Sequence, residues 1–213
     1  MHADTVKPRI LLTGFGPFPK MEVNPTGRLM EHIATLTEPF PGICAHTAVL
    51  EVDYLRCEEQ FRQAVEANQP EAILSFGVYK GADNIRLERI AVNFDDATTA
   101  DNGGLQRQGE QIVKDGPVGY WSTLPVEAMQ RALVAADIPA AFSSHAGTYL
   151  CNHIFYYGRH WIETRGLRIP MGFIHVPPFP EQVPKEDKLQ GMALEVLFRT
   201  AQVCVGVVAA STR

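Results

Sequence analysis

The sequence predicts an α/β fold, with a single domain built as a three-layer α/β/α sandwich around a twisted, mainly parallel but mixed sheet. Short apolar runs of strand composition alternate along the chain with longer segments of helical periodicity, which is the pattern of such sheets. No repeat or linker interrupts residues 1–213, and 213 residues suit one large domain. Between residues 77 and 119 no helix is predicted, so an antiparallel hairpin fits there.

Capping residues and prolines set the expected elements of the first half of the chain. Asn24-Pro25 has the form of an N-cap followed by proline at the first helical position. Asp53 is expected to cap the next helix, whose apolar face should include Leu55 and which ends before Pro70. The expected elements are a strand at 9–13, a helix from 24–25 to about 36, a strand at 47–52, the helix after Asp53, and strands at 72–76 and 85–94.

A polar, glycine-rich segment at 95–119 separates the two halves. It has no helical or strand period, and a run of this length inside a compact domain is often a functional loop or lid. After it we expect a helix at about 125–136, a strand at 140–143, a helix that begins near Leu150 and stops at Gly166, a strand at 168–176 and a final helix at about 186–209.

Charge and cysteine content narrow the class of protein. The net charge of −5 and the lack of a dense basic run argue against nucleic acid as the main partner. The four cysteines form no C-x-x-C pair and are too few to staple a chain of this length, so we expect reduced thiols and a cytoplasmic location. The polar stretch 1–9, the short apolar run 10–12 and the short apolar stretch 203–210 predict neither a signal sequence nor a membrane span.

Cys151 is the candidate nucleophile that stands out by position. The loop ending in Ala146-Gly147 runs into an apolar-periodic segment, which places Cys151 in or near the first turn of a helix. Unpaired backbone N–H groups and the positive end of the helix dipole favour a thiolate there. The alternative is that Cys151 is a small buried hydrophobic residue, as an ordinary cytosolic cysteine usually is.

A base and an acidic group for such a nucleophile are also present. His175, near the carboxyl end of a predicted strand, and Glu88, inside another, complete the residue types of a nucleophile, base and orienter triad. A carboxylate in an apolar strand is more often a structural partner of a neighbouring arginine, and that alternative stays open for Glu88. Spacing alone also leaves the base open, because three other histidines compete with His175, namely His145, His153 and His160.

The sequence predicts no cofactor and no metal site. Loop 14–19 holds two glycines, but its proline and the missing third glycine do not fit a dinucleotide-binding fingerprint. His153 and His160 lie seven apart on one predicted helix, yet their apolar flanks favour packing over metal binding. In the same loop, Phe15 and Phe18 either fold back into the core or form an apolar wall of a small-molecule pocket.

Separate stretches of the chain make it similar to the pyrrolidone-carboxylate peptidases (pyroglutamyl peptidase I), a family of cysteine peptidases. The similarity runs through nearly the whole chain in unbroken order, and its cysteine and histidine blocks are specific. The stretches that carry it are 12–18 (LTGFGPF) followed by Asn24-Pro25, 85–93 (IRLERIAVN), and 146–156 (AGTYLCNHIFY) followed by 172–177 (GFIHVP) and 180–182 (PEQ).

The resemblance implies a function and assigns roles to residues. Members of the family remove an N-terminal pyroglutamyl (5-oxoprolyl) residue from peptides, and no cofactor is implied. The family's nucleophile falls on Cys151, its base on His175 and its acidic third member on Glu88. The flat lactam ring would bind in an apolar slot, and the implied substrate-binding residues are Phe15, Phe18, Asn24, Tyr149 and Leu150. Family members commonly form homotetramers, so the resemblance implies a homo-oligomer.

The chain departs from the family pattern around the site. Val78, Ala82 and Thr98 stand where the family usually has glutamine, arginine and arginine. The residues that can replace the arginine expected at the site are Arg86, Arg89 and Arg107. Two alternatives to the family activity therefore stay open. One is a related cysteine amidohydrolase with altered preference for another blocked N-terminal amide, and the other is a catalytically weak binding protein on the same scaffold.

Overall fold

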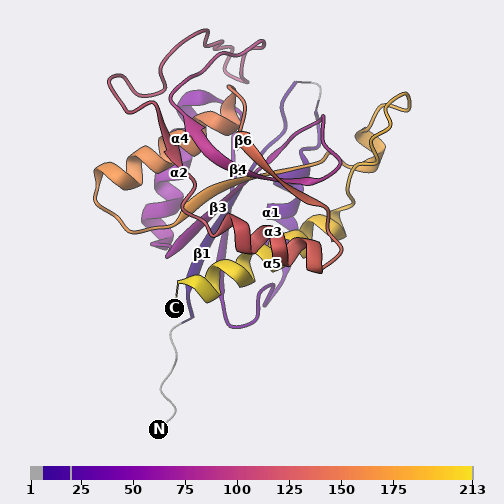
Figure 1. The fold of residues 1–213 in the computed structure, drawn as a ribbon. Helices are drawn as coiled ribbons and strands as arrows, with labels where there is room; N and C mark the ends of the chain where they lie inside the picture. Colours follow the sequence, from indigo (N-terminus) through magenta and orange to yellow (C-terminus); the bar gives the residue numbers. More distant parts are fainter. Residues whose placement is uncertain (1–6, 20, 213) are drawn as a thin grey trace.

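One seven-stranded sheet forms the centre of the computed structural model, which describes residues 7–19 and 21–212 (Figure 1). The strand order is β2-β1-β3-β7-β4-β5, and β6 pairs with β4. Most of the polar stretch 1–9 lies outside the described residues. The strands are β1 (Arg9–Phe15), β2 (Cys44–Leu50), β3 (Ala72–Val78), β4 (Ile85–Val92), β5 (Gly119–Trp121), β6 (Ala140–His145) and β7 (Met171–Val176).

The sheet is mixed, and β4 is the strand that makes it so. β1 pairs in parallel with β2 and β3, and β3 pairs in parallel with β7. β4 runs antiparallel to β7 and β5 but parallel to β6. Ile90 pairs with both Trp121 and His145, so β5 and β6 lie on opposite edges of β4. The predicted mainly parallel, mixed sheet is confirmed, with its antiparallel strand inside the predicted break.

Helices cover both faces of the sheet and complete the three layers. α2 and α4 lie on one face, and α1, α3 and α5 lie on the other (Figure 1). Because both faces are buried, the central strands are apolar at successive positions: Leu11 and Ile73 belong to one core, Leu12 and Leu74 to the other. The helices are α1 (Pro25–Thr35), α2 (Tyr54–Asn68), α3 (Val126–Ala135), α4 (Leu150–Thr164) and α5 (Leu194–Ser211), with a 3-10 turn at Pro180–Gln182.

Side-chain caps begin the first two helices, as predicted. Asn24 caps α1 through a side-chain oxygen that accepts from the backbone N–H of Thr26. Asp53 caps α2 in the same way, accepting from the backbone N–H groups of Leu55 and Arg56. The predicted apolar face of α2 was wrong at one position, because Leu55 is 74% exposed. Tyr54 is buried in its place, three residues before the buried Cys57, so the buried face begins one residue earlier.

The final helix begins later than predicted. α5 starts at Leu194 rather than near residue 186. The backbone before it is held in turns, because Gly191 has a φ of +68° and the N–H of Met192 donates to a carbonyl just after β7. β2 is also displaced, spanning residues 44–50 instead of 47–52, since its pairing with β1 extends further toward its amino end.

α5 is long and apolar enough to cross a membrane by length and composition, and it is the one such helix in the described chain. Its inner face belongs to the core, where Leu197, Ala201, Cys204, Val205 and Val208 are fully buried. A core helix of a globular domain passes the same test of length and composition, so this feature is weak support for a membrane span.

Segment 93–118, between β4 and β5, is irregular. In the described chain it contains one isolated bridge, between Asp95 and Glu110, and no helix or longer strand. The N–H of Asp96 donates to the carbonyl of Thr148 at 2.9 Å, just before α4. The segment therefore lies against the loop that leads to Cys151, beyond α2 and α4 in Figure 1. An action as a lid stays a prediction.

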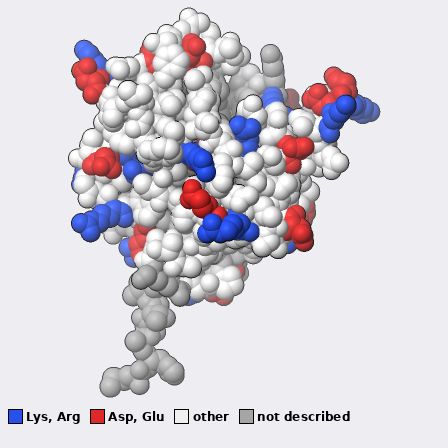
Figure 2. Space-filling model, viewed as in Figure 1, with Lys and Arg blue, Asp and Glu red and all other residues white. Residues whose placement is uncertain are grey.

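Charged side chains are spread over the surface. Figure 2 shows Lys and Arg interspersed with Asp and Glu across the face seen in Figure 1. Several charged side chains form exposed ion pairs, among them Arg28 with Glu31 at 2.8 Å. Nucleic-acid binding requires basic side chains gathered on one face, and the described part of this face has no such gathering.

Candidate active site

Cys151 lies in the first turn of α4, as predicted. Tyr149 is the N-cap residue, and within the described chain no side chain caps this first turn. The backbone N–H groups there can therefore bind a negatively charged oxygen that forms beside the sulfur. Cys151 is a free, partly buried thiol.

The sulfur of Cys151 lies directly over β3. A Cβ atom added to Gly77 would stand 2.8 Å from the Cys151 sulfur and 2.7 Å from the ring of Phe173. Gly77 is also the residue that pairs with His175 across β3 and β7. The missing side chain at Gly77 thus lets the sulfur approach the sheet beside the imidazole. Sequence analysis missed this role, for which the signal was a glycine at the end of an apolar strand.

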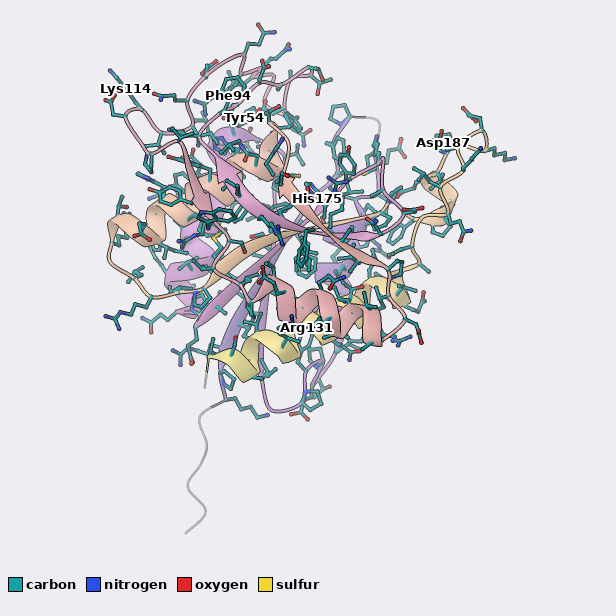
Figure 3. All side chains as sticks on the ribbon, viewed as in Figure 1. Tyr54, Phe94, Lys114, Arg131, His175 and Asp187 are labelled. Atoms are coloured by element: carbon teal, nitrogen blue, oxygen red, sulfur yellow. The ribbon has the colours of Figure 1, made fainter. Side chains whose placement is uncertain are left out.

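His175 and Glu88 form a buried pair beside that sulfur. Nδ1 of His175 lies 2.8 Å from Oε1 of Glu88, and the two residues are 4% and 0% exposed. Their strands are antiparallel neighbours, with Glu88 opposite Phe173. Since Nδ1 faces the carboxylate, Nε2 is the ring nitrogen left for Cys151, whose side chain contributes to the raised pKa of His175. Figure 3 shows His175 at the centre of the molecule.

The surroundings raise the pKa of His175 to about 9. Burial lowers this pKa, but the negative charge and hydrogen bond of Cys151, followed by the hydrogen bond and charge of Glu88, more than offset the burial. The imidazolium is therefore the favoured form at neutral pH. Sequence analysis named Glu88, Cys151 and His175 together, and the structure brings these three side chains into contact.

Four of the five predicted substrate-binding residues lie in the same apolar core as the nucleophile. Phe15 and Leu150 are buried there, while Phe18, Tyr149 and Cys151 pack against it at partial exposure. The Tyr149 hydroxyl donates to a backbone carbonyl of segment 93–118 at 3.1 Å. Tyr149 and Leu150 directly precede Cys151 at the start of α4, and Phe18 and Tyr149 are the partly exposed members of the set.

Asn24, the fifth predicted substrate-binding residue, has its polar atoms engaged within the chain. Its Oδ1 accepts hydrogen bonds from Thr26 and its Nδ2 donates to the carbonyl of Gly16 at 2.9 Å. Asn24 thus caps α1 and holds the loop that carries the two phenylalanines. Its direct contact with a substrate stays a prediction.

The two residues after the cysteine tie the first turn of α4 to the end of β4. Asn152 accepts from the N–H of Val92 and donates to its carbonyl, both at 2.9 Å. His153 lies 2.7 Å from Asp95 through Nδ1 and 2.9 Å from Glu58 through Nε2. These bonds position the sulfur relative to β4. Sequence analysis missed them, although a polar Asn-His pair inside an apolar helix start was their signal.

The other histidines have partners away from the sulfur. His145 is exposed and accepts from the N–H of Gly147 at 3.1 Å. His160 lies 2.8 Å from the hydroxyl of Tyr120. The described residues contain no group of three or more His, Cys, Asp or Glu side chains placed to hold a metal ion. Of the four candidates, His175 is the one that contacts the nucleophile.

The three candidate arginines lie in different places. Arg86 is beside the triad, with its Nε 3.8 Å from Oε1 of Glu88. Arg89 faces Glu127 on the other side of the sheet, at 3.8 Å. Arg107, on segment 93–118, pairs with the buried Asp95 at 3.1 Å. Arg86 is therefore the one whose charge lies near the carboxylate of Glu88.

Comparison with known proteins identifies the family. A family model described as pyroglutamyl peptidase matches residues 8–212. The chain belongs to this family. A pyrrolidone-carboxylate peptidase of Vibrio vulnificus is 41% identical over 191 residues, covering 89% of this chain and 87% of the relative. One from Streptomyces coelicolor is 40% identical over 176 residues, covering 83% and 81%. The resemblance stated from the sequence is confirmed.

Solved structures of the pyroglutamyl peptidase family share the fold. The crystal structure of Bacillus amyloliquefaciens pyroglutamyl peptidase I superposes with a TM-score of 0.90 at 31% identity, covering 96% of this chain and 98% of that one. Pyrrolidone carboxyl peptidase from Thermococcus litoralis has a TM-score of 0.90 at 34% identity, with 95% and 94% covered. The predicted single-domain α/β fold and the cysteine peptidase class are confirmed.

Proposed function

We propose that this protein removes N-terminal pyroglutamyl residues from peptides, with Cys151 as nucleophile, His175 as base and acid, and Glu88 as the group that orients the imidazole. The observation that carries the proposal is the buried contact of Glu88 with Nδ1 of His175, which leaves Nε2 for the sulfur. Family membership supports the reaction. Residues 1–213 form the single catalytic domain in this proposal.

Attack by the thiolate opens the reaction. The Cys151 sulfur adds to the carbonyl carbon of the pyroglutamyl amide, and the carbonyl oxygen becomes an oxyanion. The uncapped N–H groups at the start of α4 stabilise that charge. Because the imidazolium is the favoured form of His175 at neutral pH, the ring holds a proton that it can pass to the leaving amine.

Proton transfer completes the cycle. Nε2 of His175 donates its proton to the leaving amine, the C–N bond breaks, and a pyroglutamyl thioester stays on Cys151. The neutral imidazole then takes a proton from water, whose oxygen attacks the thioester. Collapse of the second oxyanion releases pyroglutamate, and the proton returns to the sulfur–imidazole pair. Glu88 keeps Nδ1 as a donor throughout, which fixes the tautomer.

The apolar region beside the sulfur is the proposed site for the lactam ring. Phe18 and Tyr149 offer the ring partly exposed apolar surface, and the buried Phe15 and Leu150 support them. Asn24 holds the loop that carries the two phenylalanines. A blocked amino terminus carries no charge, so shape and a few hydrogen bonds select it. Peptides with a free amino group would bring an ammonium ion into this apolar region, which disfavours them.

The compartment and the assembly belong to the same proposal. Four free thiols support a reducing compartment, for which we propose the cytoplasm, with no membrane and no nucleic acid as partner. A homo-oligomer, and a tetramer in particular, is proposed from the family resemblance. Sedimentation velocity of the purified protein tests the assembly, and a monomer at micromolar concentration would contradict it.

Hydrolysis of a fluorogenic pyroglutamyl amide under reducing conditions tests the proposed function. Wild type, Cys151→Ala and a variant in a buried thiol outside the site, Cys204→Ala, are assayed beside a proline amide. We expect turnover in the wild type and in Cys204→Ala, loss in Cys151→Ala, and none with the proline amide. Activity that survives Cys151→Ala would overturn the assigned nucleophile.

A second candidate function is a related amidohydrolase that prefers another blocked amine. Val78, Ala82 and Thr98 favour it, since Ala82 is buried next to the end of β3 and Thr98 is exposed, so neither supplies a charge at the site. Rapid alkylation of Cys151 at neutral pH without pyroglutamyl turnover would favour this candidate. Alkylation no faster than that of a model thiol would favour a binding protein instead.

A further inference from the structure

We propose that the ring of Tyr79 forms the subsite for the residue that follows the pyroglutamyl group, and that it directs the enzyme toward substrates with an aromatic or large apolar side chain there. The inference rests on the proposed function, because it concerns the leaving half of the same substrate. It names the side chain that discriminates among pyroglutamyl peptides.

The first step is the path of the leaving amine. Nδ1 of His175 is held by Glu88 at 2.8 Å, so the leaving nitrogen must receive its proton from Nε2. The residue that carries this nitrogen therefore passes beside the imidazole ring. Any exposed side chain that touches the imidazole is in reach of that residue.

Two aromatic rings pack against the imidazole, and they differ in access. Phe173 has its ring centroid 5.0 Å from that of His175, but it is 1% exposed and belongs to the core. Tyr79 has its centroid 5.8 Å from that of His175 and is 43% exposed. Tyr79 is thus the ring that both contacts the base and presents apolar surface to a ligand.

The Tyr79 ring is held in place from several sides. Its backbone N–H donates to the carbonyl of Val176 at 2.9 Å, at the end of β7. The guanidinium of Arg86 lies over the ring at 4.6 Å and donates to Ser143 at 2.9 Å. A fixed ring loses little conformational freedom when a ligand stacks on it, which favours binding.

The ring of Tyr79, and not its hydroxyl, is the part that we expect to contact the substrate. Among the described residues, no hydrogen bond to the Tyr79 hydroxyl is found. Aromatic side chains pair best with other aromatic or apolar groups, in offset or edge-to-face contact. A substrate with alanine in the second position gains little from such a surface, and one with phenylalanine gains most.

The test compares pyroglutamyl-phenylalanine with pyroglutamyl-alanine as substrates of four proteins. These are the wild type, Tyr79→Ala, Tyr79→Phe and a matched control, Trp121→Ala, which removes a ring that is 67% exposed on β5. The ratio of kcat/KM for the two peptides is the readout. A general loss of structure lowers both values together and leaves their ratio unchanged.

We expect the wild type to prefer the phenylalanine peptide by about 2- to 10-fold, the range for one aromatic contact. Tyr79→Ala should bring the ratio close to one, mainly by raising KM for the phenylalanine peptide, whereas Tyr79→Phe and Trp121→Ala keep the preference. An unchanged ratio in Tyr79→Ala overturns the inference while the proposed function stands. No turnover of either peptide by the wild type overturns both.

Discussion

Two buried histidines of this protein, His175 and His153, have nearly the same surroundings and different consequences. Each has Nδ1 facing a carboxylate that is fully buried, at 2.8 Å from Glu88 for His175 and 2.7 Å from Asp95 for His153. The pKa is raised in both, although burial lowers it in both. Burial and one carboxylate therefore do not distinguish the proposed catalytic histidine, His175, from His153.

The difference lies at the second ring nitrogen. Nε2 of His153 lies 2.9 Å from Glu58, so both nitrogens donate to carboxylates and the ring has none left for a reacting group. The second nitrogen of His175 is left for Cys151, whose side chain helps to raise the pKa of His175. His153 is bonded to a carboxylate at both ring nitrogens and joins α4 to α2 and to segment 93–118. His175 is bonded to a carboxylate at one ring nitrogen and can transfer a proton through the other.

Replacing each histidine with glutamine tests the comparison directly, and we expect it to give the largest effect. His175→Gln removes the proton carrier, and we expect kcat to fall by about 10²–10⁴-fold. It also leaves the buried Glu88 with Arg86 alone at 3.8 Å, so we expect the melting temperature to fall as well. His153→Gln removes the cation that Glu58 and Asp95 share and leaves Asp95 with Arg107 alone, and we expect a loss of about 3 kcal/mol in unfolding free energy, or roughly 6–12 °C in Tm.

Steady-state kinetics and thermal unfolding of both variants measure the two effects. The activity of His153→Gln should stay within about tenfold of wild type below its melting temperature, since the bonds of Asn152 still join the first turn of α4 to β4. A deeper loss of kcat in His153→Gln than in His175→Gln would reverse the assignment of the two roles.

Gly77→Ala sharpens the comparison, because Gly77 lies beside both Cys151 and His175, whereas His153 has no such place next to the sulfur. The new methyl group would overlap the Cys151 sulfur, which must move away from the imidazole. A displacement of about 1 Å at a reacting atom costs about 10²-fold in rate, so we expect kcat to fall by that factor. Crystallography of the variant measures the displacement, and an unmoved sulfur with normal activity would contradict the close approach.

A matched control for this variant is Gly206→Ala in α5. A Cβ at Gly206 meets no atom within 4 Å, and alanine favours the helix by about 1 kcal/mol. We expect this variant to keep full activity with an equal or higher Tm. A loss of activity here would show that α5 affects the site in a way not visible in its packing.

The pH profile sharpens the comparison further. Acylation needs the imidazolium form of His175, whose pKa is about 9, so kcat/KM should fall as the pH rises through that value. Glu88 contributes to raising this pKa, and Glu88→Gln should therefore move the alkaline limb to lower pH while it lowers the maximum rate. An alkaline limb that stays in place in Glu88→Gln would contradict the role given to the carboxylate.

The smallest effect concerns how the stabilisation by His153 depends on pH. Its folded pKa is raised by the hydrogen bonds and charges of Asp95 and Glu58, against the effect of burial, so the charged ring favours the folded state. This stabilisation is fully present below the unfolded pKa of about 6.5 and is lost as the pH rises through the folded value. Urea unfolding of wild type and His153→Gln should give free energies that converge at alkaline pH, and a gap that widens would contradict this sign.

Part of the fold could be predicted because its determinants are local. Asn24 and Asp53 cap α1 and α2 through bonds to residues two or three positions away, which a sequence pattern contains. The start of α5 could not, because the backbone around Gly191 is held by a bond from Met192 to a carbonyl after β7. Residue 186 has the composition of a helix start, but a distant segment decides its conformation.

The sequence by itself determined the class of fold, the family, and the short set of residues from which a site could be built. Periodicity and capping are properties of neighbouring residues, and the motifs around Cys151 and His175 are continuous stretches. Only the tertiary structure decided which histidine meets the sulfur. Strand order β3-β7-β4 sets Gly77 and Glu88 on either side of β7, and no local pattern encodes which strands become neighbours.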